Sequence, residues 1–238
     1  METTFDAVIL ANGTFPTHPV PLGILSRATR IVACDGAIAA LAEKTGSSLL
    51  LQSPPTSITV IGDGDSVPKE FRHLLIKVDE QDDNDLTKAT RYCLSSLSLN
   101  PRTASMSPLS RDPAPTLAYL GCTGGREDHT LGNIALLMRY YREMGVEGRM
   151  FTDHGLFTPA RGRRAFSSFP GQQVSIFNFG CSSLHSEGLK WQSYPYREWW
   201  QGTLNEAIAD TFTLHADGCY MVFQTFASKG HREHRRDA

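Results

Sequence analysis

Residues 57–66 read Ser-Ile-Thr-Val-Ile-Gly-Asp-Gly-Asp-Ser, an apolar, β-branched run that stops at alternating glycines and aspartates. Such a run is typical of a buried strand, and the glycines predict a tight turn directly after it. Four other short apolar runs have the same form, at residues 7–11, 30–34, 74–78 and 116–120. Helical patterns follow at residues 37–44, 87–97 and 127–144. We therefore predict an α/β fold in which helices sandwich a mainly parallel sheet.

The pattern changes near residue 148. Five later segments have the alternation and the Gly, Pro and Asn punctuation of antiparallel strands, at residues 166–169, 173–179, 188–191, 210–215 and 219–226. We predict an α/β domain over residues 1–147 and a C-terminal antiparallel β-sandwich domain over residues 148–238. Residues 95–115 are rich in Ser and Pro, which predicts a surface insertion between a helix and a strand.

Composition excludes several classes of protein. The 238 residues carry a net charge of −2, so nothing indicates a nucleic-acid surface. The sequence has no apolar run of the roughly 20 residues that span a bilayer and no signal-peptide pattern, so we expect a cytoplasmic protein without membrane contact. Five scattered cysteines without Cys-x-x-Cys spacing favour reduced thiols over disulfides or a zinc site.

Polar motifs follow the predicted strands at the same topological position. They are Asp35, the Asp63–Asp65 turn, the acidic run at residues 79–85 and the glycine-rich segment at residues 121–133. Ligands of open α/β sheets bind outside the carboxyl ends of the strands. We therefore expect these motifs to meet on one edge of the sheet.

The acidic motifs indicate a divalent cation. Asp63 and Asp65 are spaced to approach one ion, and five acids crowd into seven residues, 79–85. Mg²⁺ relieves such repulsion and usually binds a substrate phosphate as well. Each motif also has a plain structural interpretation, as a helix-capping turn or as a solvated helix start. Lys88, in the following helix, is placed to pair with Asp85 or to reach a phosphate.

The glycine-rich segment indicates an anion site. Gly124 and Gly125 precede a helix and expose backbone N–H groups, and Arg126 offers a fork for phosphate oxygens. Asp128 and His129 then fall in the first helical turn. The segment lacks the Gly-Lys-Ser/Thr ending of a Walker A loop. A capped helix after a glycine-rich turn, with a surface arginine, is the structural alternative.

In combination these motifs resemble the thiamine pyrophosphokinase family. The matching segments are Ile-Gly-Asp-Gly-Asp-Ser at 61–66, Gln-Asp-Asp-Asn-Asp-Leu-Thr-Lys at 81–88, Gly-Gly-Arg-Glu-Asp-His at 124–129, Asp-Gly at 35–36, Gly-Leu-Lys-Trp at 188–191 and Gly-Thr-Leu-Asn-Glu at 202–206. The resemblance spans nearly the whole chain. Glu80, Asn84 and Leu204 depart from it, standing where many members have Asp, Thr and, in bacteria, Ser.

The resemblance implies transfer of a diphosphate from ATP to the hydroxyethyl oxygen of thiamine, with Mg²⁺ as cofactor. By resemblance and by charge density, Asp63, Asp65 and Asp85 are assigned to the metal. Arg126 and the Gly124–Gly125 backbone are assigned to the phosphates.

The resemblance implies further roles for residues around these groups. Asp128 orients Arg126 or lines the same site, and His129 and Lys88 are nucleotide-binding candidates. Asp35 and Asp82 are secondary candidates for the metal, its waters or the thiamine hydroxyl. Gln81, Ser186 and Trp191 are expected to contact thiamine, at a site shared by the two subunits of a homodimer.

Two alternative functions stay open. One is a diphosphate transfer to another hydroxymethyl heterocycle, such as a pterin; the Gly-Leu-Lys-Trp segment argues against it. The other is a non-catalytic nucleotide or thiamine sensor. The complete acidic set argues against the sensor, because a sensor can lose metal ligands without penalty.

Overall fold

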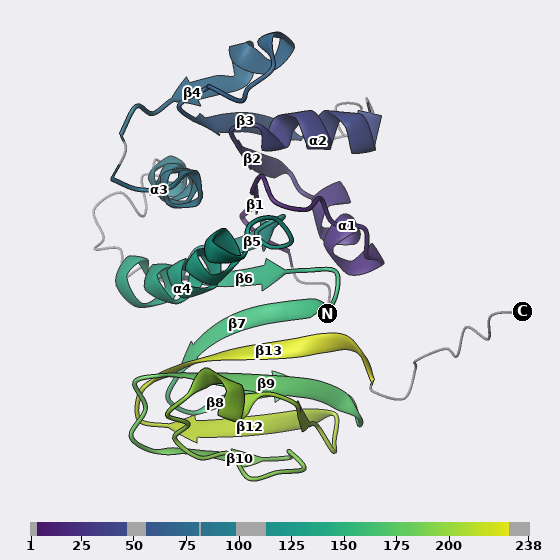
Figure 1. Ribbon diagram of the computed structural model, residues 1–238, viewed down its shortest axis with the longest axis vertical. Helices are drawn as coiled ribbons and strands as arrows, with labels where there is room; N and C mark the ends of the chain where they lie inside the picture. Colours follow the sequence, from purple (N-terminus) through teal and green to yellow (C-terminus); the bar gives the residue numbers. More distant parts are fainter. Residues whose placement is uncertain (1–3, 47–55, 81, 99–112, 229–238) are drawn as a thin grey trace, which may run out of the picture. The chain divides into compact units, whose positions relative to one another are not determined.

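The computed structural model describes residues 4–46, 56–80, 82–98 and 113–228. The chain divides into two compact units, Met1–Asp153 and His154–Ala238 (Figure 1). Strand β6 (Glu147–Phe151) belongs to the first unit, which ends at Asp153. Each unit is described by itself below.

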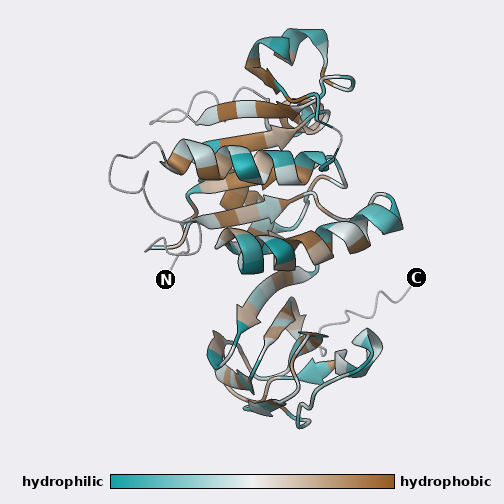
Figure 2. Cartoon of the chain, turned by 90° about the vertical axis from the view of Figure 1, so that its left-hand side faces the viewer, coloured by the Kyte–Doolittle hydropathy of each residue, from teal (hydrophilic) through white to brown (hydrophobic). Residues whose placement is uncertain are grey.

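The first unit is built on parallel strands in the order β6-β5-β1-β2-β3-β4. Besides β6, these strands are β1 (Ala7–Leu10), β2 (Arg30–Cys34), β3 (Ser57–Gly62), β4 (Leu75–Lys77) and β5 (Thr116–Leu120). The central strands β1, β2 and β5 are buried almost throughout and show no alternation, as expected for a parallel sheet covered on both faces. Figure 2 shows the resulting hydrophobic colour along these strands. The predicted fold class is confirmed.

Helices cover both faces of this sheet (Figure 1). Helices α1 (Pro19–Ser26) and α2 (Ala37–Thr45) lie on one face, and α3 (Asp85–Ser98) and α4 (Glu127–Met144) lie on the other. A short 3-10 helix, η2 (Lys69–Leu74), precedes β4. Helix α4 ends at Gly145, whose left-handed conformation suits a helix C-terminus.

The strand order reverses direction next to β1. From β1 the chain proceeds through β2 and β3 to β4, whereas β5 lies on the other side of β1 and leads to β6. Strand β1 leads to α1 on one face of the sheet and β5 leads to α4 on the other face, so a switch point lies between β1 and β5 at the carboxyl edge of the sheet. A crevice at such a switch point is the usual ligand site of open α/β sheets.

The second unit is an antiparallel β-sandwich, as predicted. One sheet has the order β11-β9-β13-β7, and the other has the order β10-β12-β8. The strands are β7 (Gly155–Arg161), β8 (Arg164–Ser167), β9 (Gln172–Phe179), β10 (Leu184–Glu187), β11 (Asn205–Glu206), β12 (Thr211–Ala216) and β13 (Cys219–Ser228). Inward side chains of both sheets form one core, in which the rings of Phe166 and Phe212 stack at 5.0 Å. A short 3-10 helix, η4 (Trp199–Gly202), precedes β11.

Two local predictions need correction. Residues 188–191 are not a strand, because Gly188 has a φ of +79° and turns the chain directly after β10. Residues 95–98 belong to α3 rather than to the predicted insertion, and residues 99–112 lie outside the described part. Helix α1 and strands β6, β7, β10 and β11 were not predicted. In the described residues no helix is long and apolar enough to cross a membrane.

Candidate active site

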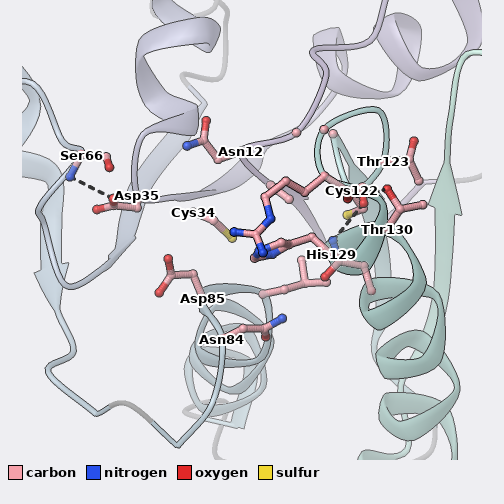
Figure 3. A pocket seen from close by; sticks show the side chains of 17 residues that line it. Asn12, Cys34, Asp35, Ser66, Asn84, Asp85, Cys122, Thr123, His129 and Thr130 are labelled. Atoms are coloured by element: carbon pink, nitrogen blue, oxygen red, sulfur yellow. Dashed lines mark hydrogen bonds between the residues drawn. The ribbon is translucent and has the colours of Figure 1, made fainter.

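A cavity of about 410 Å³ opens at the carboxyl edge of the first unit's sheet (Figure 3). Its walls come from the ends of β1, β2 and β5 and from the first turns of α3 and α4. Asp35 and Asp85 lie on one side of the cavity in Figure 3, and His129, Thr130 and Thr123 lie on the other. The cavity therefore has an acidic side and a side built from the glycine-rich segment.

Asp35 organises the acidic side. Its carboxylate oxygens accept hydrogen bonds from the backbone N–H groups of Gly64, at 3.1 Å, and Ser66, at 3.0 Å. Asp35 is buried and has a φ of +43°, which is uncommon for a residue other than glycine. A Cβ atom on Gly62 would lie 2.9 Å from the Asp35 side chain, so this strand end requires glycine. The loops after β2 and β3 are thus held together by one carboxylate.

Asp85 is the first residue of α3, and it lines the cavity. Burial raises the pKa of Asp85, the nearby Lys88 lowers it, and the carboxylates of Asp35 and Asp63 raise it further. The Nζ atom of Lys88 lies 3.4 Å from Asp85 Oδ1 and 3.4 Å from the carbonyl oxygen of Val78. Lys88 is buried and does not line the cavity, so it faces Asp85 rather than the space where a phosphate would bind.

Asp63 and Asp65 form the turn after β3. The Asp63 carboxylate accepts the backbone N–H of Asp65 at 3.0 Å. Asp63 is half-buried, Asp65 is exposed, and neither lines the cavity. In the described ranges no three His, Cys, Asp or Glu side chains are gathered closely enough to hold a metal ion by themselves. Mg²⁺ usually takes one or two carboxylates, waters and substrate phosphates, so the acidic side suits Mg²⁺ without such a cluster.

The acidic run at residues 79–85 is arranged differently from our prediction. Four of its five acids pair with basic side chains: Asp79 with Lys77 at 2.7 Å, Glu80 with Arg91 at 3.3 Å, Asp83 with Arg91 at 2.5 Å and Arg139 at 3.3 Å, and Asp85 with Lys88 at 3.4 Å. Asp82 is exposed and does not line the cavity. Arginine and lysine therefore relieve most of the repulsion that we attributed to a metal site, and Asp85 is the member that faces the cavity. Gln81 lies outside the described residues.

Arg126 and His129 line the opposite side of the cavity. The Arg126 guanidinium donates from Nε to Asp128 Oδ1 at 3.1 Å and from Nη2 to Oδ2 at 2.6 Å. This bidentate bond lowers the pKa of Asp128, and the backbone N–H of His129 also donates to the carboxylate. Asp128 does not line the cavity, so the geometry agrees with the role of orienting Arg126.

The glycine-rich segment is bonded to the loop after β1. Backbone N–H groups of Gly13 and Thr14 donate to the carbonyl oxygens of Gly121, at 2.8 Å, and Thr123, at 2.9 Å. The Thr14 hydroxyl donates to the carbonyl of Gly124 at 2.7 Å. Two loops far apart in sequence therefore form one wall, in which the Gly125 backbone is exposed to the cavity.

Comparison with known proteins identifies the family of the chain. Residues 23–147 match the model described as thiamin pyrophosphokinase, catalytic domain, and residues 155–223 match thiamin pyrophosphokinase, substrate-binding domain. The chain belongs to the thiamin pyrophosphokinase family. No curated protein matches the chain significantly in sequence.

Solved structures of this family share the fold. Thiamin pyrophosphokinase from Candida albicans is 18% identical with a TM-score of 0.73, and the match covers 92% of this chain and 88% of that chain. The yeast enzyme is 17% identical with a TM-score of 0.71, over 94% and 87% of the two chains. The Bacillus subtilis enzyme is 19% identical with a TM-score of 0.64, over 92% and 98%. At these identities the likeness establishes the fold alone.

The second unit holds two predicted residues, Ser186 and Trp191. Ser186 is buried, and its hydroxyl accepts the backbone N–H of Ser193 at 3.0 Å. Trp191 is 51% exposed, and the ammonium of Lys190 lies 4.9 Å from the centre of its ring. Trp191 and Asn205 exchange two hydrogen bonds, at 3.2 and 2.8 Å. The indole therefore offers an exposed aromatic surface that already has a cation beside it.

Several cavity residues received no individual role in the sequence analysis, although most of them lie within the motifs that it identified. They include Asn12, Gly13, Cys34, Ser66, Asn84, Cys122, Thr123 and Asn133. Asn12 and Gly13 directly follow the first predicted strand, so the rule applied to Asp35 and Asp63 would also have found them. Asn133 had no such signal: it lies within α4 and donates to the Cys122 carbonyl at 2.9 Å. Burial raises the pKa of the Cys122 thiol to about 12 and that of Cys34 well above its usual range.

The Asp83 ion pairs predict a stability effect. We expect Asp83→Asn to lower the free energy of unfolding by about 1–3 kcal/mol, because the Asp83 side chain is only 12% exposed and links Arg91 of α3 to Arg139 of α4. Asp82→Asn, one residue earlier and exposed, should change it by less than about 0.5 kcal/mol. Urea unfolding of both variants measures the difference. Equal effects would contradict the structural role of Asp83.

The position of Gly124 predicts a second effect. Its φ is +79°, and a Cβ atom there would lie 2.4 Å from Thr14 Oγ1. We expect Gly124→Ala to cost about 2–4 kcal/mol, since the overlap adds to the strain of a left-handed alanine. Gly46→Ala is the control, because Gly46 has a φ of +55° but nothing within 4 Å of an added Cβ; it should cost only about 1–2 kcal/mol. Thermal unfolding compares the two, and equal losses would contradict the close approach of the loops.

Proposed function

We propose that this protein transfers a diphosphate group from ATP to the hydroxyethyl oxygen of thiamine, giving thiamine diphosphate and AMP. The observation that carries the proposal is the division of the cavity, with carboxylates on one side and Arg126, His129 and a glycine-rich backbone on the other. The matches to both a catalytic and a substrate-binding domain of thiamin pyrophosphokinase support thiamine and nucleotide substrates.

The acidic side suits Mg²⁺. Asp85 and Asp35 face the cavity, and Asp63 lies close enough to raise the pKa of Asp85. We propose Asp85 as a direct ligand together with Asp63 and Asp65 of the neighbouring turn, and Asp35 as a ligand or a partner of metal-bound water. When bound, the ion would neutralise phosphate oxygens and hold the phosphate chain. Cations are favoured here because the carboxylates are crowded and partly desolvated.

The opposite side suits the transferred phosphates. Arg126 keeps donors available beyond the two that bind Asp128, and the Gly124–Gly125 backbone presents N–H groups at the start of α4. Phosphoryl transfer passes through a loose transition state, so positioning and charge stabilisation matter more than a general base. Asp128 contributes by fixing the guanidinium before the substrate arrives.

We propose the thiamine contacts on the basis of the family resemblance. Trp191 would stack on the thiazolium or the aminopyrimidine, and Ser186 and Gln81 would bond the pyrimidine edge. Because Lys190 already lies over the Trp191 ring, a thiazolium cation would need the other face of the ring or would have to displace the ammonium. A homodimer in the cytoplasm also remains a prediction.

The reaction is tested by AMP release. We expect AMP to form from ATP and Mg²⁺ with thiamine, and thiamine diphosphate to appear in equal amount by chromatography. A hydroxymethyl pterin in place of thiamine should give no AMP. AMP release with the pterin alone would establish the other acceptor, and binding of ATP or thiamine without any AMP release would indicate a sensor.

The metal assignment is tested by single carboxylates. We expect Asp85→Asn and Asp65→Asn each to lower kcat by at least 100-fold at saturating Mg²⁺ while circular dichroism remains unchanged, because each removes a charged ligand. Asp79→Asn is the control: Asp79 is exposed, pairs with Lys77 and does not line the cavity. An active, Mg²⁺-saturable Asp65→Asn variant would remove Asp65 from the metal site.

A further inference from the structure

We propose that Asn84 binds the phosphate chain of the nucleotide through its side-chain Nδ2 atom. This inference rests on the proposed function and assigns the site one more binding residue. Asn84 stands where many family members have Thr, and it lines the cavity immediately before Asp85. The Oδ1 and Nδ2 atoms of its carboxamide have different roles. The hydrogen bonds of Oδ1 determine which of the two atoms faces the cavity.

The oxygen end of Asn84 caps helix α3. Asn84 Oδ1 accepts the backbone N–H of Thr87 at 3.0 Å and the Thr87 hydroxyl at 2.9 Å. The first of these is the usual N-cap bond to the third helical residue. Both partners are donors, so turning the carboxamide over would bring its NH₂ group against an N–H. The two hydrogen bonds from Thr87 therefore determine the orientation of the Asn84 amide.

A buried tyrosine reinforces that orientation. Tyr140 of α4 lies 2.7 Å from Thr87 Oγ1, and both side chains are almost fully buried. Because the Thr87 hydroxyl gives its one hydrogen to Asn84, the Tyr140 hydroxyl must donate to Thr87. Burial raises the pKa of Tyr140, so it keeps its proton at neutral pH. The relay Tyr140–Thr87–Asn84 thus runs from the core to the cavity wall, with Tyr140 and Thr87 as positioning residues.

The nitrogen end of Asn84 is left to face the cavity. In Figure 3 the Nδ2 atom is directed toward the side that carries His129 and Thr130, away from the carboxylate of Asp85. Arg126 and the exposed Gly125 backbone belong to that same side. An NH₂ group can only donate. Donors that converge on one space, next to the carboxylates that we propose as metal ligands, suit an anion bound between them. The ligand atom that matches is a phosphoryl oxygen.

Two variants separate the cap from the donor. Asn84→Ser keeps an N-cap oxygen and loses the NH₂ group, so we expect an unchanged melting temperature but an ATP Kd raised by roughly ten-fold, the loss expected for one hydrogen bond to a charged group. Asn84→Asp keeps the cap and puts a carboxylate in place of the NH₂ group. It should weaken ATP binding by more than Asn84→Ser does, because the new charge repels the phosphates.

Ligand controls identify which part of the nucleotide is bound. Calorimetry with ATP and with inorganic tripolyphosphate should show the same fold-loss in Asn84→Ser, whereas adenosine should bind the variant and the wild type equally. In steady-state kinetics the KM for ATP should rise while the KM for thiamine stays constant. An effect on adenosine or on thiamine alone would overturn the assignment to phosphate.

A further variant tests the relay. Tyr140→Phe removes the donor to Thr87, so it should weaken ATP binding by less than Asn84→Ser and should add nothing in the Asn84→Ser background. Full additivity would overturn the positioning role of Tyr140.

Two results would overturn the Asn84 proposal itself. One is an unchanged ATP Kd in Asn84→Ser. The other is tighter Mg²⁺-dependent ATP binding in Asn84→Asp, which would place an oxygen of residue 84 on the metal. These failures are distinct from a failure of the proposed function, in which the wild-type protein would release no AMP.

Discussion

The geometry of the candidate site depends on the carboxylate of Asp35. With its backbone in a left-handed conformation at the end of β2, Asp35 accepts hydrogen bonds from two N–H groups of the loop after β3. That loop carries Asp63 and Asp65, so the placement of two further acids is decided by one buried side chain. Unpaired backbone groups at a partly buried loop are costly, and Asp35 satisfies two of them while also lining the cavity.

A second constraint is the contact between the loops after β1 and β5. These loops leave the sheet where the strand order changes direction, and their backbones bond to each other directly. The close approach leaves no room for side chains at Gly13 and Gly124. The glycines therefore let the two loops join into one wall, and the Gly125 backbone of that wall is exposed to the cavity. The loops after β2 and β3 therefore supply carboxylates to one side of the site, and the joined loops after β1 and β5 supply backbone groups to the other side.

The sequence predicted the parts of the molecule that follow from periodicity. Helix α4 was predicted with its observed bounds, because its apolar spacing is regular and a glycine ends it. Helix α1 was missed, since it opens with Pro19 and Pro21 and carries little contrast between its faces. The acidic run was misinterpreted for another reason: Arg91 and Arg139, which neutralise Asp83, lie on two helices, and only the fold brings them together. The direction of the Asn84 amide likewise depends on Tyr140, which is distant in sequence.

The floor of the cavity includes Cys34 and Cys122, whose buried thiols remain protonated at neutral pH. Oxidants and electrophiles attack the thiolate form, so these sulfurs are poor targets although they line the cavity. Cys34 is the last residue of β2, and Cys122 follows β5 by two residues, with β1 between the two strands. The two thiols therefore line the site as small, polarisable groups of low reactivity, and we expect peroxide to oxidise them slowly.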